Sequence, residues 1–169
     1  NLKEIVEIAH KHNMLVLVDE AHGTHFYFGE NMPVSAMEAK ADMAAVSMHK
    51  TGGSLTQSSF LLCGKNVNSN YVRQIINLTQ TTSASYLLLT SLDLARKNLA
   101  LNGKNIFNKT VELANYARDE INNLGGYNAF SKDFINNDTV FDFDVTKLSI
   151  HTRDIGLAGI EVYDILRDK

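Results

Sequence analysis

The chain has 169 residues, of which 44% are hydrophobic, and its formal net charge is −3. A chain of this length can bury a core of its own, and its slight acidity gives no general attraction for nucleic acid or an anionic membrane. No apolar stretch is long enough to cross a bilayer, and the single cysteine, Cys63, excludes an internal disulfide. We therefore expect an ordinary globular protein, with the cytoplasm as its default location.

Both ends of the sequence lie inside amphipathic helical patterns. The chain starts at Asn1 without an initiator methionine, and it stops at Lys169. We therefore expect these residues to be an incomplete chain, part of a longer polypeptide.

Helical patterns alternate with short apolar runs in the first part of the chain. The runs are continuous and rich in β-branched residues, as is typical of strands that are buried on both faces of a parallel sheet. The expected strands are 14–18, 42–47 and 58–63, and the expected helices are 2–12, 37–40 and 71–78. This alternation favours an α/β fold with a mostly parallel sheet.

The second part of the chain changes character after two long helical patterns. These cover 86–101 and 106–124, and we interpret Asn102-Gly103 between them as a break. The later pattern predicts two strands and a helix, at 140–145, 148–152 and 160–166. We expect a large α/β domain over 1–125 and the start of a smaller α+β domain over 126–169.

Two of the apolar runs end in residues that carry chemistry. Asp19 follows the first run, and Lys50 lies three residues after Ser47, which ends the second. Ligands of open α/β sheets bind beyond the carboxyl ends of strands, so Asp19 and Lys50 can face the same crevice. A fixed lysine can form a Schiff base with pyridoxal 5′-phosphate (PLP), and a fixed aspartate can keep the pyridine nitrogen protonated. Ser47 can donate a hydrogen bond to a phosphate.

Three stretches of the sequence carry a resemblance to a known family. They read LVDEAHGTHF (17–26), SMHKTGGSLTQS (47–58) and TTSASY (81–86). Together they resemble the middle of an ornithine/lysine/arginine decarboxylase, a PLP-dependent enzyme of fold type I with the aspartate aminotransferase fold. The resemblance covers essentially the whole chain, and Ser-x-His-Lys is its most diagnostic element.

The resemblance implies roles for individual residues. Lys50 would form the Schiff base, Asp19 would pair with the pyridine nitrogen, and His22 would lie close to the cofactor or substrate. Further implied cofactor contacts are Ala21, Ser47, His49, Thr82, Ser83 and Ser85. The last three would belong to a segment that reaches across a dimer interface towards the partner's phosphate.

The implied reaction is decarboxylation of a basic amino acid, with the electron pair left by carbon dioxide delocalised into the protonated ring. The substrate would be lysine, ornithine or arginine, and the residues that choose among them are expected in other segments or a partner subunit. The family implies a homodimer or a larger homo-oligomer. We expect the 169 residues alone to be inactive, because the upstream phosphate-binding turn and the residue that stacks on the ring lie outside them.

Two other enzyme classes remain open. An aminotransferase or a lyase of the same fold would use the same aspartate and lysine. The run LVLVDEAH (15–22) is also how a DEAH-type helicase presents its catalytic carboxylates. Against the helicase, there is no G-x-x-x-x-G-K-[ST] loop and no downstream Ser-Ala-Thr, and the charge is acidic.

A metal site is the non-enzymatic alternative. The spacing of Asp19, Glu20, His22 and His25 permits one, but the sequence supplies no second, well-separated ligand set. Glu20 itself is expected to be a residue of the turn, without a catalytic role.

Overall fold

The computed structural model describes residues 1–169, and the chain divides into two compact units, Asn1–Asn105 and Ile106–Lys169. This division falls inside a long helix, so it does not test the domain boundary expected at residue 125, which stays a prediction. None of the helices combines the length and the hydrophobicity needed to span a bilayer.

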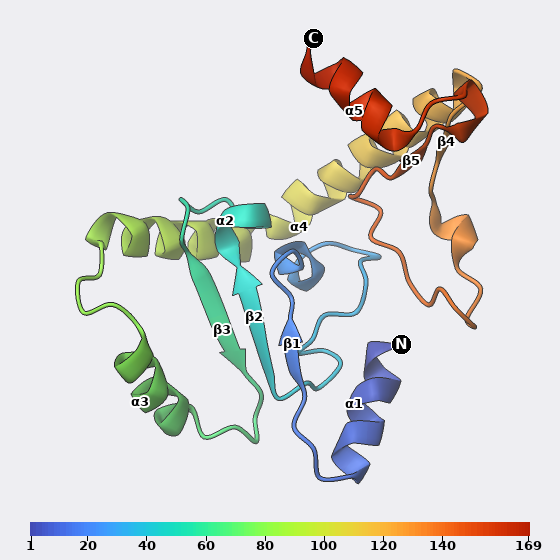
Figure 1. Cartoon of the computed structure of the whole chain (residues 1–169). Coiled ribbons are helices and arrows are strands. Elements are labelled where there is room, and N and C mark those ends of the chain that lie inside the picture. The colour runs from blue at the N-terminus through green and yellow to red at the C-terminus, as the bar shows by residue number, and fades with distance from the viewer. The chain divides into compact units, whose positions relative to one another are not determined.

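The first unit contains a sheet of three strands in the order β1 (Leu17–Asp19), β2 (Met43–Ser47) and β3 (Ser59–Cys63) (Figure 1). β1 and β2 are parallel, whereas β2 and β3 are antiparallel. The connection 48–58 holds only the short helix α2 (Met48–Thr51) and returns the chain beside β2 in the opposite direction. The expected mostly parallel sheet is therefore wrong for these three strands, which form a mixed sheet.

One face of this sheet is covered by α1 (Leu2–Lys11) and the segment before β2. The buried core here is built from small residues that allow close packing: Val6, Ala36, Ala39, Ala41 and Ala44. The expected short helix at 37–40 is a series of turns instead.

The other face of the sheet is open. Leu17 on β1 is 67% exposed and Leu61 on β3 is 42% exposed, on the side of the sheet opposite Val46 and Leu62. The strand expected at 14–18 is therefore not buried on both faces within this chain. A continuous apolar run shows that both sides of a strand are apolar, but these 169 residues place a layer on only one side.

Two helices complete the first unit and lead out of it. α3 (Ser69–Thr79) is capped by Asn68, whose side-chain oxygen accepts hydrogen bonds from the N–H groups of Asn70 and Tyr71. α4 (Tyr86–Asn123) is a single helix of 38 residues, so the expected break at Asn102-Gly103 is wrong.

The second unit contains short elements that follow α4. β4 (Asn128–Ala129) pairs antiparallel with β5 (Ile150–His151), and α5 (Gly159–Arg167) ends the chain. Two 3-10 helices, η2 (Lys132–Phe134) and η3 (Arg153–Ile155), lie between these elements.

The strand expected at 140–145 does not form. Asp142 accepts a hydrogen bond from the N–H of Phe143 (2.8 Å), and Asp144 accepts one from the N–H of Thr146 (3.0 Å). These local bonds offer the backbone an alternative to a β-ladder. The alternation of apolar and polar residues in this segment therefore does not specify a strand.

Candidate functional site

The carboxyl ends of β1 and β2 meet at one edge of the sheet because the two strands are parallel (Figure 1). Asp19 is the last residue of β1 and lies opposite Ala45, and the N–H of Glu20 extends the pairing by donating to the Ala45 carbonyl (3.0 Å). Ser47 ends β2, and α2 starts at the next residue. The structure thus places Asp19 and the helix that carries Lys50 at the same edge.

A hollow on the open face of the sheet joins three of the predicted site residues. Asp19, Ala21 and Ser47 all line it, and the rest of its lining comes from apolar and small residues of the three strands. Alternation along the strands puts the side chains of Asp19, Ala45 and Ser47 on this same face. A polar edge beside an apolar floor suits a planar ring that carries polar groups.

The Asp19 carboxylate is exposed, and its orientation is fixed by the turn that follows β1. Its Oδ1 accepts a hydrogen bond from the N–H of Ala21 at 3.1 Å. His22 is exposed in the same turn. An exposed carboxylate held by its own turn is available to a cationic group above the hollow.

Lys50 is exposed on α2, directly beyond the end of β2. The neighbouring His49 places Nδ1 2.9 Å from the carbonyl oxygen of Ser58. Because a carbonyl can only accept, Nδ1 carries the hydrogen and Nε2 is left for another partner. Ser47 precedes the helix without using its hydroxyl as a side-chain cap.

Two hydroxyl groups lie just after Lys50 in the chain, outside the lining of the hollow. Thr51 Oγ1 and Ser54 Oγ are buried and have no hydrogen-bond partner. A buried polar group left unpaired costs roughly 1–3 kcal/mol, which a bound acceptor such as a phosphate would remove. The exposed Lys50 amine, the Asp19 carboxylate and the Ser47 hydroxyl are groups that fit the aldehyde, the ring nitrogen and the phosphate of PLP.

The glycines after Lys50 have local structural reasons. A Cβ on Gly52 would lie 2.7 Å from Cε of Met48, and Gly53 has a φ of +86°, which side chains rarely adopt. Both glycines let the chain turn tightly from α2 towards β3.

The segment 81–85 lies apart from these residues. The connection from α3 to α4 contains Thr82, Ser83 and Ser85, all of which are exposed. This connection lies on the far side of β3 from β1 (Figure 1). Ser85 Oγ accepts a hydrogen bond from the N–H of Leu88 (3.5 Å), as expected for a residue that starts a helix. The chain does not bring these three residues to Asp19.

Glu20 has a larger structural role than a turn residue, which the sequence analysis missed. It is 7% exposed, its Oε1 accepts a hydrogen bond from the N–H of Ala36 (2.8 Å), and its Oε2 accepts one from the Tyr27 hydroxyl (2.5 Å). Burial, together with the bond to Glu20 and its charge, raises the pKa of the Tyr27 phenol above its ordinary value. The available signal was alternation, because the residue after Asp19 must point to the covered side.

No group of three or more His, Cys, Asp or Glu side chains is close enough together to hold a metal ion. The Glu20 carboxylate is used by Tyr27 and Ala36, so the metal site that the spacing permits is not assembled.

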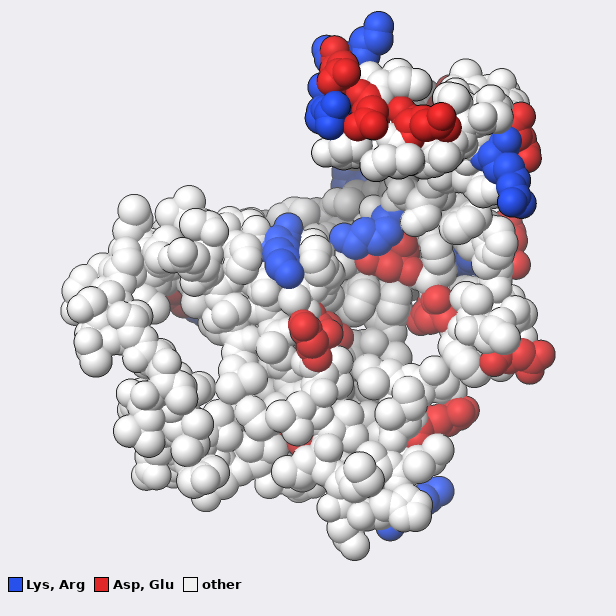
Figure 2. All heavy atoms as spheres, viewed as in Figure 1, with Lys and Arg blue, Asp and Glu red and all other residues white.

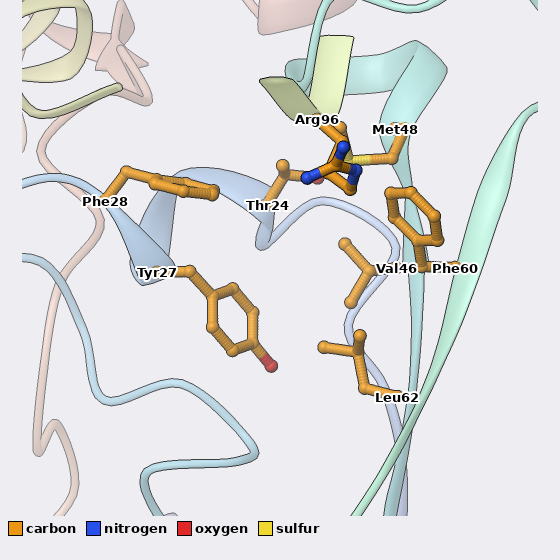
Figure 3. Close-up of a pocket in the computed structure, with 8 residues that line it drawn as sticks. All are labelled: Thr24, Tyr27, Phe28, Val46, Met48, Phe60, Leu62 and Arg96. Atoms are coloured by element: carbon orange, nitrogen blue, oxygen red, sulfur yellow. The ribbon is translucent and has the colours of Figure 1, made fainter. Parts of the chain in front are cut away.

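A separate apolar pocket of about 260 Å³ lies on the covered side of the sheet, beside η1 (Thr24–Tyr27) (Figure 3). Its lining consists of Thr24, Tyr27, Phe28, Val46, Met48, Phe60, Leu62 and Arg96. None of the predicted site residues belongs to this lining.

Comparison with known proteins gives consistent results. A family described as Orn/Lys/Arg decarboxylase, major domain, matches residues 1–155. Arginine decarboxylases from Halalkalibacterium halodurans, Bacillus cereus and Bacillus subtilis are 48%, 45% and 46% identical to the chain over 99–100% of its length. The chain spans only 34–37% of the length of these relatives.

Among solved structures, a chain from the crystal structure of a SepCysS–SepCysE N-terminal domain complex superposes with a TM-score of 0.55. It is 17% identical to this chain and aligns with 77% of it, which is 35% of the solved chain. At this identity the likeness shows the fold alone.

Proposed function

The chain belongs to the Orn/Lys/Arg decarboxylase family, and we propose that the protein uses PLP to remove the α-carboxylate of arginine. The placement of Asp19 and Lys50 at one edge of the sheet is the observation that carries this proposal. Arginine is chosen among the basic amino acids because the relatives at 45–48% identity are named arginine decarboxylase.

Membership of this family shows that the helicase alternative is wrong. The structure also gives a physical reason against it. A DEAH-type helicase would need both acidic residues of the motif at its nucleotide site. Here the Glu20 carboxylate is buried and bound to Tyr27 and Ala36, on the opposite side of β1 from the Asp19 carboxylate.

When bound, PLP supplies an electron sink for the electron pair that remains on the α-carbon after carbon dioxide leaves. In the proposed site, the Nζ of Lys50 would hold the cofactor covalently at its aldehyde carbon, whose oxygen leaves as water. The Asp19 carboxylate holds a proton at the ring nitrogen, because a nearby anion stabilises the positive charge there. Hydroxyl groups at Ser47, Thr51 and Ser54 donate hydrogen bonds to the phosphate oxygens.

The remaining predicted residues act around this centre. Ala21 lines the hollow and would pack against the ring, and His22 would lie on the substrate side. His49 holds the start of α2 to Ser58 and so fixes the helix that carries Lys50.

We also propose that the enzyme is a homodimer or a larger homo-oligomer. The exposure of Thr82, Ser83 and Ser85, away from Asp19 in their own chain, supports a role towards the site of a second copy.

Borohydride reduction of the full-length protein with PLP, followed by peptide mapping, tests the proposal. We expect the pyridoxyl group on Lys50, its loss in Lys50→Ala, and its retention in the matched surface variant Lys65→Ala. In parallel, release of carbon dioxide from arginine should exceed release from lysine and ornithine. A label on a different lysine would refute the site, and a preference for another amino acid would refute the substrate.

A further inference from the structure

We propose that Glu20 is a positioning residue for the cofactor site, whose buried carboxylate locks the turn after β1 and thereby holds Asp19 and Ala21 against the hollow. The inference rests on the proposed function, since it concerns the site for PLP. It adds a residue that acts from the covered side of the sheet.

The backbone of Glu20 is fixed on both sides. Its N–H donates to the Ala45 carbonyl of β2 (3.0 Å), and its own carbonyl accepts a hydrogen bond from the N–H of Gly23 (2.9 Å). A Cβ on Gly23 would lie 2.4 Å from Cγ of Glu20, so the turn is folded tightly against this side chain. The end of β1 and the turn 20–23 therefore form one closely packed piece.

The side chain of Glu20 connects this turn to two other segments. Oε1 accepts a hydrogen bond from the N–H of Ala36, which is fully buried in the core. Oε2 accepts a hydrogen bond from the hydroxyl of Tyr27 in η1. Hydrogen bonds to an ionised carboxylate are about twice as strong as neutral ones. One carboxylate thus ties the end of β1 to both the near and the far part of the loop that follows it.

Water cannot readily take the place of the Glu20 carboxylate as the acceptor for these donors. The ring of Tyr27 lines the apolar pocket beside Val46 and Leu62 (Figure 3). Ala36 is 0% exposed. If the carboxylate is lost, the fully buried Ala36 N–H is left without an acceptor and the half-buried Tyr27 hydroxyl loses its partner. The loop must then shift to satisfy the Ala36 N–H.

Such a shift would be transmitted to the open face through adjacent residues. The Asp19 carboxylate is oriented by the N–H of Ala21, and both residues flank Glu20 in the chain. Displacements of about 1 Å in a positioned group reduce binding and catalysis strongly. We therefore expect cofactor binding to depend on Glu20, although Glu20 does not face the hollow.

The test uses the full-length protein and two substitutions. Glu20→Gln keeps the size of the side chain but places an amide donor at one of the two accepting positions. Tyr27→Phe removes one donor and leaves Glu20 intact, so it carries the test if Glu20→Gln does not fold. Glu38→Gln is the matched control, because Glu38 is exposed and pairs only at the surface with Lys3 (3.0 Å).

Four measurements separate positioning from simple stability: the Kd for PLP, the pH dependence of the visible absorption of the bound cofactor, the exchange rate of the Ala36 amide, and the change in kcat compared with the change in KM. We expect both variants, measured well below their Tm, to raise the Kd about tenfold or more and to shift the absorption profile. Glu20→Gln should also speed Ala36 exchange, and kcat should fall more than KM rises. Glu38→Gln should match wild type in all of these.

Folded variants with the wild-type Kd and absorption profile, and with only a lower Tm, would overturn the inference and leave the proposed function intact. A wild-type protein that does not bind PLP would instead overturn the proposed function and this inference together.

Discussion

Gly103, inside the long helix α4, lies directly against the ring of Phe28, so that a Cβ at this position would be 2.9 Å from two ring carbons. The glycine therefore permits a close approach between α4 and the loop that follows β1. Nearby, Lys104 forms an ion pair with Glu30 (2.6 Å), which marks a second contact between the same two segments.

Because of this contact, we expect Gly103→Ala to lower the stability of the protein, although Gly→Ala in a helix usually raises it. Gly→Ala inside an exposed helix normally stabilises by roughly 0.5–1 kcal/mol. At Gly103 the added methyl should overpack the Phe28 ring and destabilise by about 1–3 kcal/mol, because the neighbouring atoms are already in contact. Thermal unfolding of Gly103→Ala measures this. Gly159→Ala at the start of α5, where a Cβ meets nothing within 4 Å, is the control and should not lower Tm.

The buried carboxylate of Asp42 predicts a loss of stability in acid. It accepts hydrogen bonds from the Val16 N–H (2.8 Å) and lies 2.9 Å from His10 Nε2. Burial raises the pKa of Asp42, but the bonds from Val16 and His10 outweigh it, and the net pKa lies below the ordinary value. The folded state therefore binds this proton less readily than the unfolded state does.

The stability from Asp42 is present above its unfolded pKa, about 4, and is lost as pH falls through the lower folded pKa. Denaturant unfolding from pH 7 to pH 3 should show Asp42→Asn less stable than wild type at pH 7, with the difference shrinking in acid. Asp93→Asn, at an exposed carboxylate, should follow wild type throughout. A difference between Asp42→Asn and wild type that stays constant with pH would contradict the prediction.

Arg118 connects several segments of the second unit through its buried side chain. This side chain is 3% exposed, and its guanidinium donates to the carbonyls of Phe130 (2.5 Å), Val145 (3.0 Å) and Lys147 (3.3 Å). Arg118→Lys keeps the charge but cannot reach several carbonyls at once.

We expect a loss of about 2–4 kcal/mol on Arg118→Lys, from several buried acceptors left unpaired. Amide exchange in residues 129–147 should rise first, because these are the segments that the guanidinium joins. Arg167→Lys, on an exposed turn of α5, should change neither quantity. Unchanged exchange in Arg118→Lys would show that the unit holds these loops by other means.

The limits of sequence-based prediction can be seen in these same residues. Asp19 and Lys50 could be placed at one edge because strand ends in a parallel pair coincide, which is a local rule. The partners of Glu20 and Gly103 could not be predicted, because Ala36, Tyr27 and Phe28 lie elsewhere in the chain and only the fold brings them into contact. A glycine in a helical pattern signals a break and a close contact equally well until the neighbour is known.

The same limit applies to the strands. The run at 14–18 predicted a strand that the structure has at Leu17–Asp19, so the two overlap only in part. The open face of this strand depends on which layers the chain supplies, and no local pattern shows that. Residues 140–145 do alternate between apolar and polar, but they do not form a strand. Asp142 and Asp144 accept hydrogen bonds from backbone N–H groups one and two residues further along the chain.

We expect substitution of Asp19 to reduce activity without unfolding the protein. Asp19→Asn keeps an oxygen that can accept the Ala21 N–H but removes the negative charge. The proton at the ring nitrogen would then lose its anionic partner, and we expect kcat/KM for arginine to fall by roughly 10²-fold or more. Because the side chain is exposed, Tm should stay close to wild type. Glu4→Gln on α1 is the matched surface control, and an active Asp19→Asn enzyme would refute this role.

Thr51 and Ser54 predict opposite effects on the free and the cofactor-bound protein. Their hydroxyl oxygens are buried without partners, so Thr51→Val and Ser54→Ala remove unpaired polar groups and should leave the Tm of the cofactor-free protein unchanged or higher. If the hydroxyls donate to the phosphate, the same variants should raise the Kd for PLP by about 5- to 10-fold each. A hydrogen bond to a charged group contributes roughly 1.5–3 kcal/mol, and removing an unpaired buried hydroxyl from the cofactor-free protein offsets part of that loss. Thr56→Val, at an exposed position of the same connection, should alter neither value. Calorimetry of the cofactor-free and the PLP-saturated proteins measures both effects, and a drop in Tm of the cofactor-free variants with an unchanged Kd would show that the two hydroxyls serve the fold and not the ligand.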